Sequence, residues 1–103
     1  MNRQQYLLTC VSEECHEVGQ RAIKQARFGD QQCQPKKGDG PEYPPNHART
    51  LEEFLQLVAV MEMAGFNVRA ILGSYEAGLA INLKKQRVEE TILESAGYGL
   101  LHE

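Results

Sequence analysis

The chain has 103 residues, of which 42% are hydrophobic and 24% are charged. That balance is typical of a folded globular domain and excludes intrinsically disordered and fibrous classes. The net charge of −3 argues against a nucleic-acid-binding protein, because non-specific affinity for nucleic acids comes mainly from clustered Lys and Arg. We therefore expect one domain over residues 1–103 and no nucleic-acid partner.

The N-terminal segment and the cysteines predict a cytoplasmic protein without a membrane partner. Only Leu7 and Leu8 stand together before polar residues return, which is too short for the apolar region of a signal peptide. No stretch approaches the length that spans a bilayer. The three cysteines, Cys10, Cys15 and Cys33, are odd in number and lack CxxC spacing, which fits reduced thiols and argues against a zinc site.

The first predicted element is an amphipathic helix from about Gln4 to Arg27. This segment contains no Pro, and its apolar residues recur at helical spacing. They are Leu7, Leu8, Val11, Cys15, Val18, Ala22 and Ala26. Gly29 suits a C-terminal cap, so we expect the helix to end near Phe28.

A long loop is expected at about 29–49, where Pro and Gly stand among Lys, Asp, Gln and Asn. Loops of this length in a small domain are either functional lids or disordered. A second helix is expected from Thr50 to about Ala64, with apolar residues on nearly every side. Such a helix is normally buried or lies at a subunit interface.

The remaining chain predicts a third helical region that starts near Val68 and continues past Ile92. Gly73 or Gly78 is expected to interrupt it, and Gly97 and Gly99 to end the regular structure. No alternating strand pattern of useful length is present. The sequence therefore predicts an all-α fold with at most four helical segments.

Two Glu residues of the first predicted helix form a candidate metal site. Glu14 and Glu17 are three residues apart, so their carboxylates project from one face, about 60° apart. Glu14 also points in nearly the direction of Leu7 and Val18, towards the apolar side. Like charges held this close favour a hard cation such as Mg²⁺ or Mn²⁺. The alternative is an ordinary solvated, Glu-rich turn.

Glu53 on the second predicted helix is the next candidate ligand. It points in nearly the same direction as Val60, and a carboxylate on an apolar side requires a partner. The alternative is a capping box, in which Glu53 folds back onto the backbone of Thr50.

Basic residues complete the candidate site. Cations beside a carboxylate-bound metal typically bind polyphosphate, because the metal and the cations share its negative charge. The candidates are Lys24, Arg27, Lys84 and Arg87, together with Lys85. Solvated helix faces carry similar basic runs, and this alternative stays open.

Three segments together resemble a known family. LLTCVSEECHEVGQRAIKQARFG, ARTLEEFLQLVAVMEM and KKQRVEETILESAGYG stand in the expected order and cover just over half of the chain. They resemble the all-α MazG-type nucleoside triphosphate pyrophosphohydrolases, especially short single-domain forms of bacteriophages. The resemblance implies a small antiparallel helical bundle that is completed by a homodimer or homotetramer, in the cytoplasm of a bacterial host if the chain is phage-encoded.

The resemblance also implies a ligand set and a reaction. The family's EExxE and ExxD motifs correspond here to metal ligands Glu14, Glu17, Glu53 and Gln56, which would hold Mg²⁺, or Mn²⁺, against a triphosphate. Gln56 stands where the family has Asp. Glu13 would orient or deprotonate the attacking water, Glu14 shares the catalytic assignment, and the products would be a nucleoside monophosphate and pyrophosphate.

Two other functions remain open on the sequence. Because Gln56 lacks the charge of the family's Asp, the protein could be a catalytically degenerate member that binds nucleotide without turnover. It could also be a helical interaction protein that contacts a protein partner through the loop at 29–49.

Overall fold

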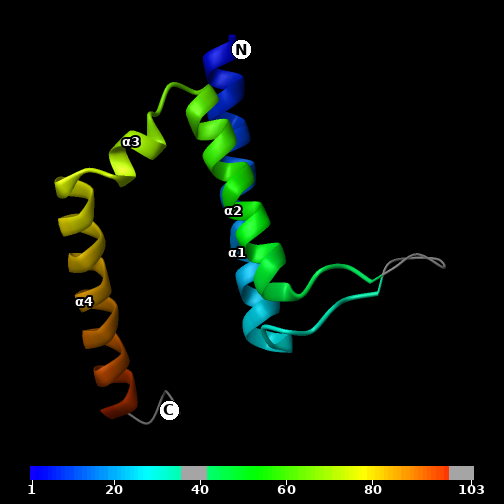
Figure 1. The fold of residues 1–103 in the computed structure, drawn as a ribbon, viewed down its shortest axis with the longest axis vertical. Coiled ribbons are helices and arrows are strands. Elements are labelled where there is room, and N and C mark those ends of the chain that lie inside the picture. The colour runs from blue at the N-terminus through cyan, green and yellow to red at the C-terminus, as the bar shows by residue number, and fades with distance from the viewer. Residues whose placement is uncertain (36–41, 98–103) are drawn as a thin grey trace. The chain divides into compact units, whose positions relative to one another are not determined.

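Four α-helices make up the regular structure of the described residues, 1–35 and 42–97, in a computed structural model (Figure 1). They are α1 (Arg3–Phe28), α2 (Asn46–Met63), α3 (Val68–Leu72) and α4 (Tyr75–Gly97). The predicted all-α class is confirmed. The chain divides into two compact units, residues 1–67 and the part from Val68 onward, and each is described by itself.

Helix α1 is closed at both ends by local hydrogen bonds. The side chain of Asn2 accepts a hydrogen bond from the Gln5 N–H at 2.8 Å, and the Gln5 side chain accepts one from the Asn2 N–H at 2.8 Å. At the other end Gly29 has a φ of 96°, and its N–H donates to the Gln25 carbonyl at 2.8 Å. The end that was predicted near Phe28 is confirmed, since a left-handed cap favours glycine.

Helices α1 and α2 lie side by side and run antiparallel (Figure 1). Near one end the Gln4 Nε2 donates to the Ala64 carbonyl at 2.8 Å, and near the other the Thr50 hydroxyl donates to the Gln25 Oε1 at 2.8 Å. Only two apolar side chains in the described part of the chain are fully buried, Leu7 and Ala64. The hairpin therefore has a thin seam rather than a full core.

Helix α2 begins one turn earlier than predicted, so the expected start at Thr50 is wrong and the connection ends at Pro45. Asn46 explains the difference, because it is only 1% exposed. Its Nδ2 donates to the Gly29 carbonyl at 3.0 Å and to the Gln32 Oε1 at 3.2 Å, and its N–H donates to the Gln32 carbonyl at 3.0 Å. Contacts with the end of α1 thus make a helical turn from residues of loop composition. Residues 36–41 of the predicted loop and Gly99 lie outside the described part.

The second unit consists of α3 and α4. The predicted interruption at Gly73 is confirmed, whereas Gly78 lies inside α4. Ser74 separates the two helices: its Oγ donates to the Ile71 carbonyl at 2.6 Å and accepts a hydrogen bond from the Ala77 N–H at 3.2 Å. A serine before the first helical residue is a favoured N-cap. Neither α3 nor α4 contains a fully buried residue among those described.

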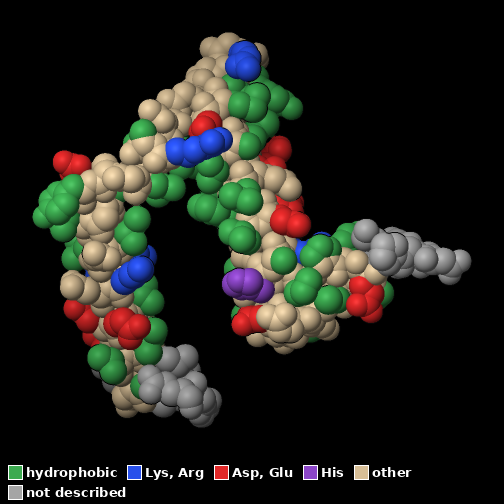
Figure 2. Space-filling view, viewed as in Figure 1, with side chains coloured by type: hydrophobic (Ala, Val, Ile, Leu, Met, Phe, Trp, Pro, Cys, Tyr) green, Lys and Arg blue, Asp and Glu red, His purple; other side chains and the backbone are tan. Residues whose placement is uncertain are grey.

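Hydrophobic side chains are widely exposed on the described surface of both units (Figure 2). In the first unit they include Leu8, Ile23, Leu51, Leu55 and Met63. None of the helices in the described ranges combines the length and the apolar character that a transmembrane span requires.

Candidate functional site

The carboxyl groups of Glu14 and Glu53 meet across the seam between α1 and α2. Both side chains are half-buried, and their carboxyl groups lie close enough to act on each other's charge. Desolvation raises the pKa of Glu14 above its ordinary value of 4.5, and the negative charges of Glu53 and Glu17 raise it further. The charge of Glu13 acts in the same direction. Two carboxyl groups this close repel each other when both are ionised, which favours the protonated form of one of them.

Glu14 also has an unsatisfied oxygen. Its Oε2 is enclosed and has no hydrogen-bond partner among the described residues. A buried carboxylate oxygen without a partner is unfavourable, and a cation satisfies it without a proton. Oxygen ligands and an excess of negative charge are what a hard divalent ion requires, and the Glu14–Glu53 pair supplies two carboxyl groups of that kind.

The capping alternative for Glu53 is wrong. Helix α2 begins at Asn46, with Pro45 before it. Thr50 therefore lies inside the helix and is not the N-cap residue that a capping box with Glu53 requires. The Thr50 hydroxyl instead donates to the Asn46 carbonyl at 3.1 Å and to Gln25 of α1. Glu53 is consequently free of a capping role and available to Glu14.

The other predicted site residues, the ligands Glu17 and Gln56 and the catalytic Glu13, are more exposed than this pair. Glu13, Glu17 and Gln56 are exposed, and the first two act on Glu14 only through their charge. Gln56 follows Glu53 by three positions, which puts the two side chains about 60° apart on α2. Within residues 1–35 and 42–97, no three His, Cys, Asp or Glu side chains already form a cluster with metal-binding geometry.

The predicted phosphate contacts Lys24 and Arg27 are exposed on α1 and point away from the direction of Glu14. On an ideal helix Lys24 lies about 80° and Arg27 about 140° around α1 from Glu14, and Arg27 is roughly 20 Å further along the axis. The Arg27 guanidinium instead lies over the Phe28 ring, 5.8 Å from its centroid. Lys84 and Arg87 are exposed on α4, in the second unit.

A basic residue outside the predicted set lies on the carboxylate side of α1. Arg21 is only 6% exposed, and both of its terminal nitrogens are enclosed without a hydrogen-bond partner among the described residues. It follows Glu14 by seven residues, so the two side chains point within about 20° of each other. That spacing is the signal in the sequence that would have identified it.

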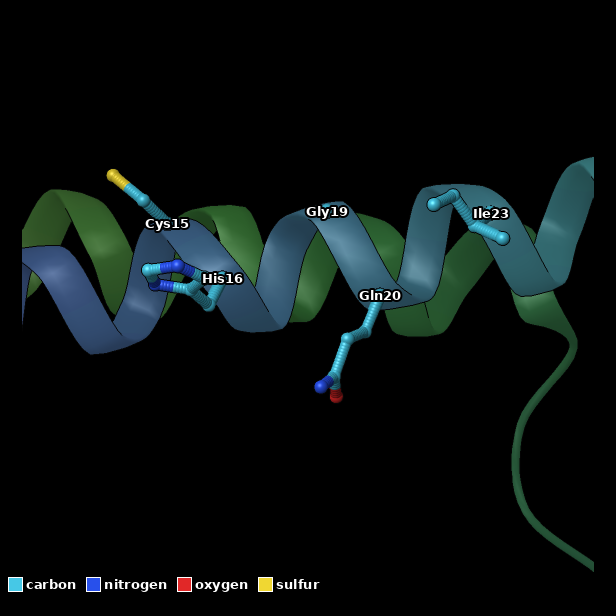
Figure 3. A pocket seen from close by; sticks show the side chains of 5 residues that line it. All are labelled: Cys15, His16, Gly19, Gln20 and Ile23. Atoms are coloured by element: carbon cyan, nitrogen blue, oxygen red, sulfur yellow. The ribbon is translucent and has the colours of Figure 1, made fainter.

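Two depressions mark the first unit. One lies between the helices where they meet the connection and is lined by Val18, Gln25, His47, Thr50, Leu51 and Phe54. The other lies on α1 alone and is lined by Cys15, His16, Gly19, Gln20 and Ile23, on a side of the helix away from α2 (Figure 3). The His16 Nδ1 is satisfied by the Ser12 carbonyl at 2.8 Å, so this second depression offers little polar chemistry.

Comparison with known proteins does not identify a family for this chain. No protein-family model matches the chain, and neither a curated protein nor a solved structure matches it.

Proposed function

We propose that the protein is a metal-dependent nucleoside triphosphate pyrophosphohydrolase of the MazG type. The observation that carries this proposal is the pairing of the half-buried carboxyl groups of Glu14 and Glu53, with Glu14 Oε2 enclosed and without a hydrogen-bond partner in the described chain. It joins the Glu-rich motif of α1 to a half-buried carboxylate of α2, as the resemblance requires. The reaction adds water across the bond between the α and β phosphates and yields a nucleoside monophosphate and pyrophosphate.

In this proposal Glu14, Glu17 and Glu53 hold Mg²⁺ or Mn²⁺, and Gln56 offers a carbonyl oxygen. When bound, the ion offsets the charge of the phosphates and lowers the pKa of water. Glu13 is exposed beside Glu14 and accepts the proton of the attacking water. Lys24, Arg27, Lys84 and Arg87 are outer phosphate contacts on the resemblance alone.

The proposal includes a homodimer or homotetramer. The hairpin buries only two apolar side chains within the described residues, which is too little for a stable core. The side of α1 that carries Cys15, Gly19 and Ile23 is turned away from α2 (Figure 3). Gly19 has open space where a Cβ would stand, so a second helix can approach closely there.

The deciding experiment is product analysis by ³¹P NMR. The purified protein is incubated with a panel of NTPs and dNTPs and Mg²⁺ or Mn²⁺. We expect pyrophosphate and monophosphate from the parent and none from Glu14→Gln. Glu52→Gln is the matched control, because Glu52 is exposed on α2 next to Glu53 and has no proposed role. Absence of pyrophosphate from the folded parent would overturn the proposal.

A second candidate is a degenerate member that binds nucleotide without turnover. The observation in its favour is Gln56, an exposed carboxamide where the resembled family has a carboxylate. In that case the parent binds nucleotide and releases no product, and Gln56→Asp creates activity. No gain in a folded Gln56→Asp variant would count against this candidate and favour the interaction protein that acts through its loop.

A further inference from the structure

We infer that Arg21 is the phosphate-binding residue of the site and that it takes a phosphate group of a metal-bound polyphosphate. This inference rests on the proposed function, but it is carried by a separate observation. Arg21 is 6% exposed, and both terminal nitrogens of its guanidinium are enclosed without a hydrogen-bond partner in the described chain.

An unpaired buried guanidinium is costly, because it has lost its hydration and gained no counter-charge. The nearest carboxylate by helical spacing is Glu17, four residues earlier on α1, and it is exposed. No hydrogen bond joins it to the Arg21 terminal nitrogens. The counter-charge is therefore expected to come from a bound anion.

The position of Arg21 relative to the carboxyl pair favours a polyphosphate over a single anion. Seven residues of helix separate Glu14 from Arg21 by roughly 10 Å along the axis on one side of α1. A cation held by Glu14 and Glu53 and an anion bound by Arg21 would then lie one after the other along the same side of α1. A chain of phosphates has matching features, since one part binds the metal and another part reaches the guanidinium.

The chemistry of arginine suits this role better than that of the exposed lysine nearby. The guanidinium is planar and donates two parallel hydrogen bonds to phosphate oxygens, whereas an ammonium acts as a point charge. Its long apolar stem can stay packed against the seam while its rotatable bonds turn the charged end towards a ligand. By contrast, Lys24 is exposed and points about 80° away from Glu14.

The test measures binding of inorganic tripolyphosphate in the presence of Mg²⁺ by calorimetry. Arg21→Met removes the charge and keeps the length, Arg21→Lys keeps the charge and loses the paired donors, and Arg3→Gln is the control on an exposed arginine of the same helix. We expect Arg21→Met to weaken binding by about tenfold or more, Arg21→Lys by less, and Arg3→Gln by no more than about twofold.

Two further measurements separate a binding role from a structural one. Mn²⁺ affinity in the absence of phosphate should stay the same or rise in Arg21→Met, because a positive charge near the carboxylates is removed. The thermal midpoint without ligand should not fall, since an uncompensated buried charge is lost. If Arg21→Met does not fold, the comparison of tripolyphosphate binding between Arg21→Lys and Arg3→Gln tests the inference instead. We expect weaker binding in Arg21→Lys.

The inference is overturned if tripolyphosphate does not bind the parent, or if it binds Arg21→Met as tightly as Arg3→Gln. Its failure is distinguishable from that of the proposed function. Release of pyrophosphate by the parent with an unchanged KM in Arg21→Met would sustain the enzyme and reject the inference. Arg21-dependent binding of tripolyphosphate without turnover would sustain the inference and reject the enzyme.

Discussion

The half-buried carboxyl group of Glu14 of α1 is paired with that of Glu53 of α2 across the seam of the hairpin, and desolvation and the charge of Glu53 raise the pKa of Glu14. Thirty-eight intervening residues separate them in the sequence, and only the antiparallel pairing of the helices brings them together. Two neighbouring carboxylates repel each other, and either protonation of one of them or binding of a metal ion removes this repulsion. Both the stability and the metal affinity of the hairpin should therefore respond to changes at this pair.

Glu14→Gln is expected to stabilise the metal-free protein at neutral pH. The pKa of Glu14 is higher in the folded protein than its ordinary value of 4.5, so the folded state binds this proton more tightly than the unfolded state does. The ionised group is therefore unfavourable to folding above its folded pKa, and the penalty vanishes as the pH falls below 4.5.

Urea unfolding at several pH values and one protein concentration checks this prediction. The advantage of Glu14→Gln over the parent should be largest near neutral pH and shrink towards acid. Glu52→Gln, an exposed neighbour of Glu53, should show no such pH-dependent advantage. If the parent is more stable than Glu14→Gln at neutral pH without metal, the predicted repulsion between Glu14 and Glu53 is contradicted.

Divalent ions should reverse that order. An ion that binds only the folded state stabilises it by about 2.7 kcal/mol at a hundredfold excess over its dissociation constant. We expect Mg²⁺ or Mn²⁺ to raise the thermal midpoint of the parent and to leave that of Glu14→Gln almost unchanged. An equal shift in both proteins would show that the ion binds elsewhere.

Gln56→Asp should tighten Mn²⁺ binding by about tenfold, because ligand charge sets much of the affinity of an oxygen site for a divalent ion. Gln56 is exposed three positions after Glu53, so a carboxylate is tolerated there without burial. Titration calorimetry measures the effect. The control is Gln31→Asp, which adds the same charge after the end of α1. An equal gain in Mn²⁺ affinity in this variant would show that the effect comes from net charge and not from a ligand at position 56.

Asn46→Ala should destabilise the hairpin by about 1–3 kcal/mol, since a buried amide with two hydrogen bonds from its Nδ2 is lost. Chemical unfolding of the parent and the variant measures the loss. The matched control is Asn67→Ala, at an exposed asparagine, which should lie within about 0.5 kcal/mol of the parent. Equal stability of the two variants would mean that Asn46 does not hold the start of α2.

Ile23→Lys should dissociate the proposed oligomer. Ile23 is 65% exposed on the side of α1 away from α2, and a lysine there puts an unpaired charge into an apolar contact between copies. Light scattering coupled to size exclusion reports the mass. Gln31→Lys adds the same charge at an exposed position of the connection and should keep the parent's mass. A parent that is monomeric at all concentrations would refute the oligomer.

The sequence by itself determined the all-α class, the end of α1 and the break between α3 and α4. Helical spacing of apolar residues, Gly29 after α1 and the break at Gly73 are short-range signals, and physical interactions within a few residues are enough to produce them. The same spacing places Glu14 and Glu17 on one side of α1, because the geometry of a single helix sets the angle between them.

Only the tertiary structure decided what depends on contacts between helices. The start of α2 at Asn46 was hidden because its hydrogen-bond partners, Gly29 and Gln32, are supplied by a distant segment. The same contacts removed the capping role of Glu53 and left it facing Glu14. Burial likewise distinguished Arg21 from the exposed basic residues, because exposure is a property of the packed seam and not of residue type.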